Sequence, residues 1–197
     1  MKKEQKEWVR IWCDDTNEND LPRVLLVGDS ITNGYQEKVR ELLTGVCYVD
    51  FFATSYAIDM PIYHKFVTTL VADSQYDLIH FNNGLHGIHI GKRTYKSRVK
   101  KLLEKISVGK KVVLATTTIV YQPNSKRKDG AWMKRVRERN AATRELALEL
   151  GFTVDDLYEA SMEIPFEKRY EDGTHYLAEG YEMLAQTVAK NIQKALK

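Results

Sequence analysis

The chain has 197 residues, and its 30 lysine and arginine side chains stand against 27 acidic ones, which leaves a net charge of +3. This length suits one domain with a core of its own, while so small a charge argues against a nucleic-acid partner. We therefore predict a single domain over residues 1–197, with residues 1–20 as an N-terminal extension packed on it through Trp8, Ile11 and Trp12.

Short apolar runs alternate with longer segments of helical period along the chain. Five runs are typical of strands: Arg23–Val27, Val46–Phe52, Leu78–Phe81, Lys111–Thr116 and Phe152–Asp155. Five helices are expected after them, at Gly34–Leu43, Pro61–Ala72, Tyr95–Ile106, Ala131–Leu150 and Leu177–Ile192. This alternation predicts an α/β domain with a mainly parallel sheet.

The longer connections all follow a predicted strand or precede the last helix. They are Ala53–Met60, Asn82–Arg93, Thr117–Gly130 and Ser161–Thr174. In an open parallel sheet the ligand crevice lies outside the carboxyl ends of the strands. We expect these four loops to meet at one rim and to hold the functional site.

Three features bear on compartment and partners. Cys13 and Cys47 lie 34 positions apart without a C-x-x-C spacing, so we expect two reduced thiols. The charged first seven residues precede no apolar stretch, so no signal peptide is expected and the location is predicted to be cytoplasmic, although a removed leader would leave no trace. No segment approaches the ~20 apolar residues of a membrane span, so no membrane insertion is expected.

One basic stretch includes Lys126, Arg127, Lys128, Lys134, Arg135, Arg137 and Arg139. The regular aromatic interleaving typical of nucleic-acid surfaces does not accompany it. We predict that this stretch is a solvated loop and helix face.

Ser30 is the first candidate for chemistry, because it follows an apolar strand that stops at Gly28. A serine hydroxyl becomes a useful nucleophile only when a base takes its proton during the attack. A lone serine after a strand is more often a helix N-cap. The nucleophile hypothesis therefore requires a base elsewhere in the chain.

His175 is the best candidate for that base, because it lies just before the last predicted helix and Asp172 precedes it by three residues. Gly173 between them permits a tight turn that brings the carboxylate to one ring nitrogen. Such a carboxylate holds the imidazole in one tautomer and stabilises the imidazolium. An α/β sheet would place Ser30 and His175 on the same rim, so the three residues form a predicted catalytic triad.

The segments Gly28-Asp29-Ser30-Ile31 and Asp172-Gly173-Thr174-His175 resemble the first and last blocks of the SGNH (GDSL-type) esterases and acylhydrolases, and the resemblance spans about residues 21 to 195. It implies a three-layer α/β/α sandwich with a flavodoxin-like, five-stranded parallel sheet. It also implies Ser30 as nucleophile, His175 as base and Asp172 as its support, with no cofactor.

The resemblance also implies an oxyanion hole, where this sequence departs from the family. Ser30 would supply its backbone N–H. The family asparagine after the third strand is replaced by His86, with Asn83 as second candidate and Asn82 beside it. The loop after the second strand has no glycine, so the backbone of Tyr56 or Ser55 would have to donate there.

A metal site is a tempting alternative for His80, His86 and His89. Their spacings of six and three fit no common zinc pattern, and no further ligand lies near them in the sequence, so we predict none. The alternation of His80 into a strand favours a core position, and His64 is expected on a helix, partly exposed.

These observations favour a serine esterase that hydrolyses a carboxylic ester through an acyl-enzyme. A small-acyl, acetylated carbohydrate is the preferred substrate, because the rim loops are short and polar and no long apolar insertion could build a lid or fatty-acyl tunnel. The rim aromatic Trp132 fits either sugar stacking or core packing. The alternatives are a lysophospholipase or acyl-thioesterase, and a non-catalytic member of the fold that binds a glycan or an anion.

Overall fold

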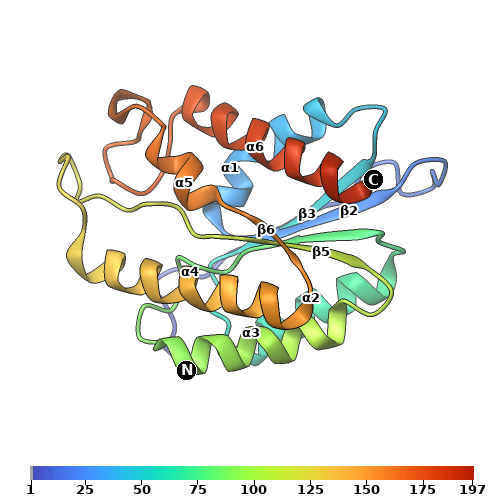
Figure 1. Ribbon diagram of the computed structural model, residues 1–197, viewed down its shortest axis with the longest axis horizontal. Coiled ribbons are helices and arrows are strands. Elements are labelled where there is room, and N and C mark those ends of the chain that lie inside the picture. The colour runs from blue at the N-terminus through green and yellow to red at the C-terminus, as the bar shows by residue number, and fades with distance from the viewer. Residues whose placement is uncertain (1) are drawn as a thin grey trace.

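The computed structural model describes residues 2–197, which form one six-stranded sheet between two layers of helices (Figure 1). The strands are β1 (Val9–Trp12), β2 (Arg23–Gly28), β3 (Tyr48–Thr54), β4 (Leu78–Phe81), β5 (Lys111–Ala115) and β6 (Thr153–Asp155). The helices are α1 (Ser30–Leu42), α2 (Pro61–Asp73), α3 (Lys92–Ile106), α4 (Gly130–Leu150), α5 (Leu157–Met162) and α6 (Ala178–Leu196), with a 3₁₀ turn, η1, at Phe166–Lys168. One layer holds α1, α5 and α6, and the other holds α2, α3 and α4.

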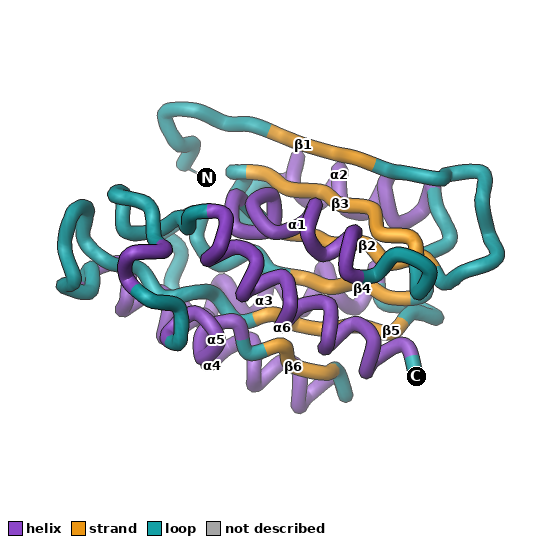
Figure 2. The backbone as a smooth tube through the Cα atoms, turned by 90° about the horizontal axis from the view of Figure 1, so that it is seen from above, coloured by secondary structure: helices purple, strands orange, loops and turns teal. Residues whose placement is uncertain are grey.

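The strand order is β1-β3-β2-β4-β5-β6, and all neighbours from β3 to β6 pair in parallel. The predicted parallel α/β/α sandwich is confirmed, since the five predicted strands take the doubly wound, flavodoxin-like order. The predicted strand count is wrong by one. β1 adds to the edge of the sheet, antiparallel to β3, with Val9 opposite Thr54 and Trp12 opposite Phe51 (Figure 2).

The N-terminal extension packs on the domain less completely than predicted. Trp8 packs against the core, but Ile11 is 44% exposed and Trp12 is 55% exposed. An edge strand has one neighbour and buries few side chains, so it carries only a weak hydrophobic pattern. This explains why β1 was not predicted.

The middle of the sheet is buried on both faces. Val24 and Leu26 of β2 belong to the core beneath α1 and α6, while Leu25 and Val27 face the core beneath α2 and α3. Each such side chain stabilises the fold by about 1.5–3 kcal/mol through burial. β2 is therefore a rigid support for the residues that follow it.

Helix α1 begins at Ser30, four residues before its predicted start at Gly34. The N-cap is Asp29, whose side chain accepts from the amide of Ile31 at 3.0 Å, so the capping role weighed for Ser30 falls to its neighbour. Gly34 therefore lies inside α1 and packs closely against α6. A Cβ at this position would come within 2.2 Å of the Tyr181 ring, which explains why glycine occurs here.

Two other boundaries differ from the prediction. β3 begins at Tyr48 and not at Val46, because the amides of Val46 and Cys47 both turn back to the carbonyl of Leu43. The short helix α5 was not predicted, and the carboxylate of Asp156 caps its first turn. Cys13 and Cys47 are free thiols, and no helix within residues 2–197 is both long and apolar enough to cross a bilayer.

Candidate active site

Ser30, His175 and Asp172 lie in one hydrogen-bonded chain, although the serine and the histidine are 145 positions apart. The Ser30 hydroxyl is 2.7 Å from Nε2 of His175, and Nδ1 of His175 is 2.5 Å from Oδ2 of Asp172. This order of hydroxyl, imidazole and carboxylate is the arrangement in which a serine can lose its proton to a base as it attacks.

The turn from Asp172 to His175 is shaped around the aspartate. Oδ1 of Asp172 accepts from the amides of Thr174 at 2.8 Å and His175 at 2.9 Å. Gly173 has φ +76°, and a Cβ there would lie 2.3 Å from the Tyr121 carbonyl oxygen, so only glycine fits. The predicted tight turn therefore exists, and it points the second carboxylate oxygen at the imidazole.

The carboxylate of Asp172 is ionised. Partial burial would raise its pKa, but the hydrogen bonds from the backbone and side chain of His175 and from the Thr174 amide outweigh it and lower the pKa. Because an ionised carboxylate only accepts, Nδ1 of His175 carries a proton and Nε2 is left to accept from Ser30. This is the tautomer that a general base requires.

A buried arginine, which no sequence motif marks, supports the same turn. The guanidinium of Arg169 donates to the carbonyl oxygen of Ser161 and lies 4.8 Å from the ring centres of both Tyr121 and Tyr176. The Tyr170 amide in turn donates to the carbonyl of His175 at 2.9 Å. These contacts hold the loop that carries the base.

His86 lies in the same pocket as Ser30 and His175. Its Nδ1 is 2.9 Å from Oε1 of Glu4, while its Nε2 is buried and has no hydrogen-bond partner within residues 2–197. Burial would lower its pKa, but the hydrogen bond to Glu4 and the charges of Asp29 and Glu4 raise it overall. The structure thus brings one predicted oxyanion donor to the triad with a free ring nitrogen.

The other predicted donors are engaged elsewhere. The amide of Tyr56 donates to Oγ1 of Thr54 at 3.1 Å, and Nδ2 of Asn83 donates to the Tyr56 carbonyl at 3.2 Å. Nδ2 of Asn82 donates to the Ala115 carbonyl, and its Oδ1 accepts from the Gly84 amide. The side-chain amide of Asn82 is therefore engaged away from the pocket that contains Ser30. Tyr56 and Asn83 do not line the pocket that contains Ser30.

Arg139 holds the loop of His86 from inside the protein. Its guanidinium donates to the carbonyl oxygens of Gly84 at 2.6 Å, His86 at 2.8 Å and Gly87 at 2.6 Å, and it lies 5.1 Å from the centre of the Tyr95 ring. The prediction that the basic stretch is solvated is wrong for this residue, which is 1% exposed. Its partners are backbone carbonyls, which leave no mark in a sequence.

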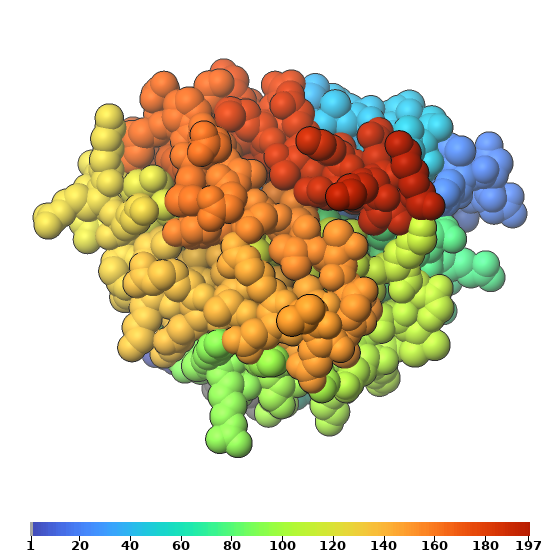
Figure 3. All heavy atoms as spheres, in the orientation of Figure 1, coloured from blue at the N-terminus to red at the C-terminus, as the bar shows by residue number. Residues whose placement is uncertain are grey.

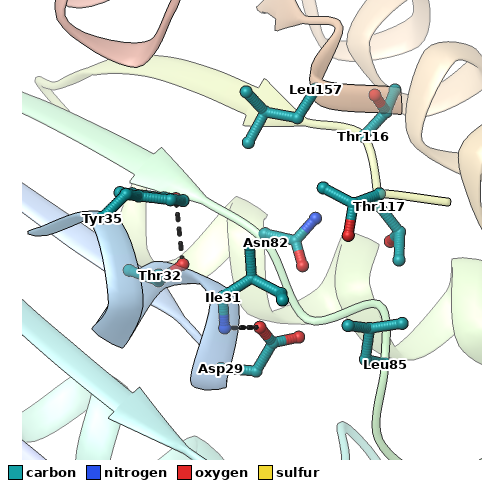
Figure 4. Close-up of a pocket in the computed structure, with 10 residues that line it drawn as sticks. Asp29, Ile31, Thr32, Tyr35, Asn82, Leu85, Thr116, Thr117 and Leu157 are labelled. Atoms are coloured by element: carbon teal, nitrogen blue, oxygen red, sulfur yellow. Dashed lines mark hydrogen bonds between the residues drawn. The ribbon is translucent and has the colours of Figure 1, made fainter. Parts of the chain in front are cut away.

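Ser30 directly follows the buried Asp29. Asp29 is 2% exposed, and within residues 2–197 only one of its carboxyl oxygens has a hydrogen-bond partner, the amide of Ile31. Figure 4 shows this carboxyl group at a small cavity, with Asn82 across it and the Thr32–Tyr35 hydrogen bond to one side. Asp29 is one of the groups that raise the pKa of His86 on the neighbouring rim.

The remaining histidines do not converge on one point. Nε2 of His80 lies 2.9 Å from Asp155 in the core, and Nε2 of His89 lies 3.1 Å from Asp59 on the surface. The predicted core position of His80 is confirmed. His64, partly exposed on α2 as predicted, bonds the carbonyl of Ile58.

The pocket at the triad is open and has a volume of about 530 Å³, within the range of small-molecule sites. One wall is apolar and consists of Leu85, Ile88, Val120 and Trp132. The other wall is the N-terminal segment Lys2–Gln5. The loop between β5 and α4, yellow in Figure 3, projects beside this end of the molecule. The predicted meeting of the rim loops is therefore observed for Asn82–Arg93, Thr117–Gly130 and Ser161–Thr174, which contribute Leu85, Val120 and Thr174 to the pocket, but no residue of Ala53–Met60 lines it.

No protein-family profile and no curated protein matches the sequence. Solved structures do match. A lipase/acylhydrolase from Enterococcus faecalis aligns with a TM-score of 0.73 at 19% identity, over 88% of this chain and 96% of that one. A variant of an acetyl-xylooligosaccharide esterase from Geobacillus stearothermophilus aligns at 0.72 and 14%, over 87% and 94% of the two chains.

A third structure, from Slackia heliotrinireducens and assigned to the SGNH hydrolases, aligns with a TM-score of 0.68 at 19% identity, over 88% of this chain and all of that one. At identities this low, the structural alignments establish the fold alone. The chain has the three-layer α/β/α fold of SGNH-type hydrolases, as the two sequence blocks indicate.

Proposed function

We propose that the protein is a serine esterase of the SGNH type, which hydrolyses a carboxylic ester through an acyl-enzyme intermediate. The observation that carries the proposal is the chain of hydrogen bonds from Ser30 through His175 to Asp172, at the mouth of an open pocket. The fold shared with acylhydrolases and esterases supports it.

The reaction follows from the protonation states. Nε2 of His175 takes the hydroxyl proton as Oγ of Ser30 forms a bond to the ester carbon, which gives a tetrahedral oxyanion and an imidazolium paired with Asp172. The oxyanion collapses, the C–O bond to the alcohol breaks, and the alcohol leaves with the proton from His175. Water, deprotonated by His175, then attacks the acyl carbon, the bond between that carbon and Oγ of Ser30 breaks, and Ser30 takes the proton back from His175 as the acid leaves.

Two groups can stabilise the oxyanion. The backbone N–H of Ser30 is in the first turn of α1, where amides have no partner inside the helix. Nε2 of His86 is the other, because it is buried at the pocket and unpartnered within the described chain. Because Nε2 of His86 lies at the pocket without a partner, we assign it the role of the family asparagine. Removing one such donor typically costs ~2.7–4 kcal/mol of transition-state stabilisation.

The proposed substrate is an acetylated carbohydrate. Trp132 lines the pocket on its apolar wall, where an indole would stack on a sugar ring, and the polar N-terminal segment on the other wall suits hydroxyl groups. The similarity to an acetyl-xylooligosaccharide esterase supports a small acyl group. A lysophospholipase or acyl-thioesterase would need a longer apolar channel.

The test compares wild type with Ser30→Ala and His175→Ala on p-nitrophenyl acetate and p-nitrophenyl octanoate, followed by acetate release from acetylated xylooligosaccharides. We expect turnover by wild type alone, with acetyl faster than octanoyl. A faster octanoyl reaction would favour the lysophospholipase or thioesterase alternative. Equal background rates for the three proteins would refute the esterase and favour a non-catalytic glycan or anion binder.

A further inference from the structure

The chain before β1 is fastened to the rim of the active site. Figure 2 shows it folding back at the end of the sheet where the long loops gather. Oγ1 of Thr54 donates to the Trp8 carbonyl at 2.7 Å, and the Trp8 amide donates to Oγ of Ser55 at 2.8 Å. Ser55 in turn donates to Oε2 of Glu7 at 2.7 Å. These bonds attach the N-terminal strap, residues 2–8, to the loop after β3.

The strap continues from Glu7 to the pocket. Oε1 of Glu7 accepts from the Glu4 amide at 2.9 Å, which fixes the turn that carries the Glu4 carboxylate to His86. The pKa of Glu4 is lowered, chiefly by its hydrogen bond with His86. The carboxylate is therefore ionised and accepts, so Nδ1 of His86 must carry the hydrogen.

This assignment has a consequence for the other ring nitrogen. In a neutral imidazole with a proton on Nδ1, Nε2 is an acceptor and cannot donate to an oxyanion. Nε2 of His86 donates only when the ring is an imidazolium. The role proposed for His86 thus depends on the charges around it.

Those charges come from several elements. Glu4 and Glu7 on the strap and Asp29 at the start of α1 favour the imidazolium. Burial opposes it. Positive charges nearby also disfavour it: the guanidinium of Arg139, which contacts the His86 carbonyl from α4, Lys2 and Lys3 in the same pocket, and His175 when it is protonated. The acidic groups prevail, and the pKa of His86 is raised.

We propose that Glu4 is a positioning residue of the active site, which orients the imidazole of His86 and keeps it charged so that Nε2–H can stabilise the oxyanion. The inference rests on the proposed esterase function and adds the strap to its machinery. It also makes the alkaline limb of the rate profile a property of His86: the donor is present while the ring is protonated and is lost as pH rises through its pKa.

The test measures kcat and KM on p-nitrophenyl acetate between pH 5 and pH 10, for wild type, Glu4→Gln and Glu7→Gln. Glutamine at residue 4 can still accept from Nδ1–H, so the ring stays oriented while the charge is lost. Glu7→Gln also removes a charge that favours the imidazolium, but it keeps an acceptor for the Glu4 amide and does not contact the ring, so it measures the contribution of a more distant charge. NMR titration of the His86 ring reports its protonation independently of activity.

For Glu4→Gln we expect the alkaline limb of kcat to move down by about one pH unit, so that kcat falls about tenfold on the alkaline side of the limb, with little change in KM. The His86 resonance should move by the same amount, and Glu7→Gln should move both by much less. Identical profiles and titrations in Glu4→Gln and wild type would overturn the role of Glu4. Because wild type and Ser30→Ala are measured alongside, a failure of the esterase itself would be seen separately, as activity that Ser30→Ala retains.

Discussion

The two ends of the sheet both contain buried charge, but they use it differently. At the amino end of β2, the guanidinium of Arg23 donates to Asp50 at 3.1 Å and to the carbonyl oxygens of Asp14 and Asp15 at 2.9 and 2.6 Å. The second oxygen of Asp50 accepts from the Tyr76 hydroxyl at 3.0 Å. In this cluster every oxygen of the buried carboxylate is occupied by a protein group.

At the carboxyl end of the same strands, several buried atoms lack a partner in residues 2–197. They include Oδ2 of Asp29, Nε2 of His86 and Oγ1 of Thr118. Leaving a buried polar group unpaired costs about 1–3 kcal/mol, so such groups concentrate where a ligand or a transition state completes them. The amino-end cluster contributes to stability, whereas the carboxyl end keeps hydrogen-bonding capacity for chemistry.

The sharpest test of this contrast is Ser30→Ala. It should lower kcat by about 10⁶-fold, as loss of a serine nucleophile does elsewhere, because it removes the hydroxyl group that takes up the acyl group. The melting temperature should change little, because the side chain is half-buried and Asp29 is the helix cap. Calorimetry measures the melting temperature, and stopped assays with p-nitrophenyl acetate measure kcat. A large drop in melting temperature would place Ser30 among the structural groups.

Asp172→Asn should lower kcat by about 10⁴-fold, because the amide can hold the imidazole in the wrong tautomer. Its effect on stability depends on pH. The pKa of Asp172 is depressed in the folded protein, so its contribution is present above the unfolded value of about 3.9 and is lost as pH falls through the lower folded value. Acid unfolding of wild type and Asp172→Asn should therefore converge at low pH. Curves that stay equally far apart at all pH values would contradict the assignment.

Replacing one buried arginine at each end of the sheet compares the two ends directly. Arg139→Met and Arg23→Met each remove a guanidinium that binds carbonyl oxygens, and each should lower the free energy of unfolding by about 3 kcal/mol. Only Arg139→Met should also lower kcat, by about 10²-fold, because it releases the loop of His86. Urea titration measures the free energy of unfolding, and initial rates measured below the unfolding transition give kcat. Equal losses of kcat in both variants would refute a special role for Arg139.

The sequence predicted the parts of the molecule that repeat a pattern. The five parallel strands were found because continuous apolar runs mark them, and Ser30, Asp172 and His175 were brought together by the rule that strand ends share a rim. The strand boundaries were less accurate, because local turns such as the one at Leu43 decide them.

What the sequence could not predict are long-range contacts between unlike partners. Glu4 forms a hydrogen bond with His86, which lies 82 positions away in the sequence. Arg139 donates to backbone carbonyl oxygens, and because every residue has one, the sequence does not reveal which of them it binds. The basic neighbours of Arg139 in the sequence suggested a solvated face, but its position on α4 decides that it is buried. Tyr56 differs for a local reason: its amide, predicted to donate to the oxyanion, instead donates to the Thr54 hydroxyl two residues away, in a turn whose geometry the residue types do not reveal.

The smallest expected effect concerns the apolar wall of the pocket. Trp132→Ala should raise KM for acetylated xylooligosaccharides about three- to tenfold, which corresponds to the 0.5–1.5 kcal/mol of an aromatic contact, and should leave kcat on p-nitrophenyl acetate nearly unchanged. Trp132→Phe, which keeps a ring face, should recover most of the loss. The comparison separates ring stacking from simple packing, because a packing defect would lower the melting temperature and affect both substrates alike. If KM for the oligosaccharide is unchanged in Trp132→Ala, the sugar does not lie against this wall, and the substrate must be sought along the strap instead.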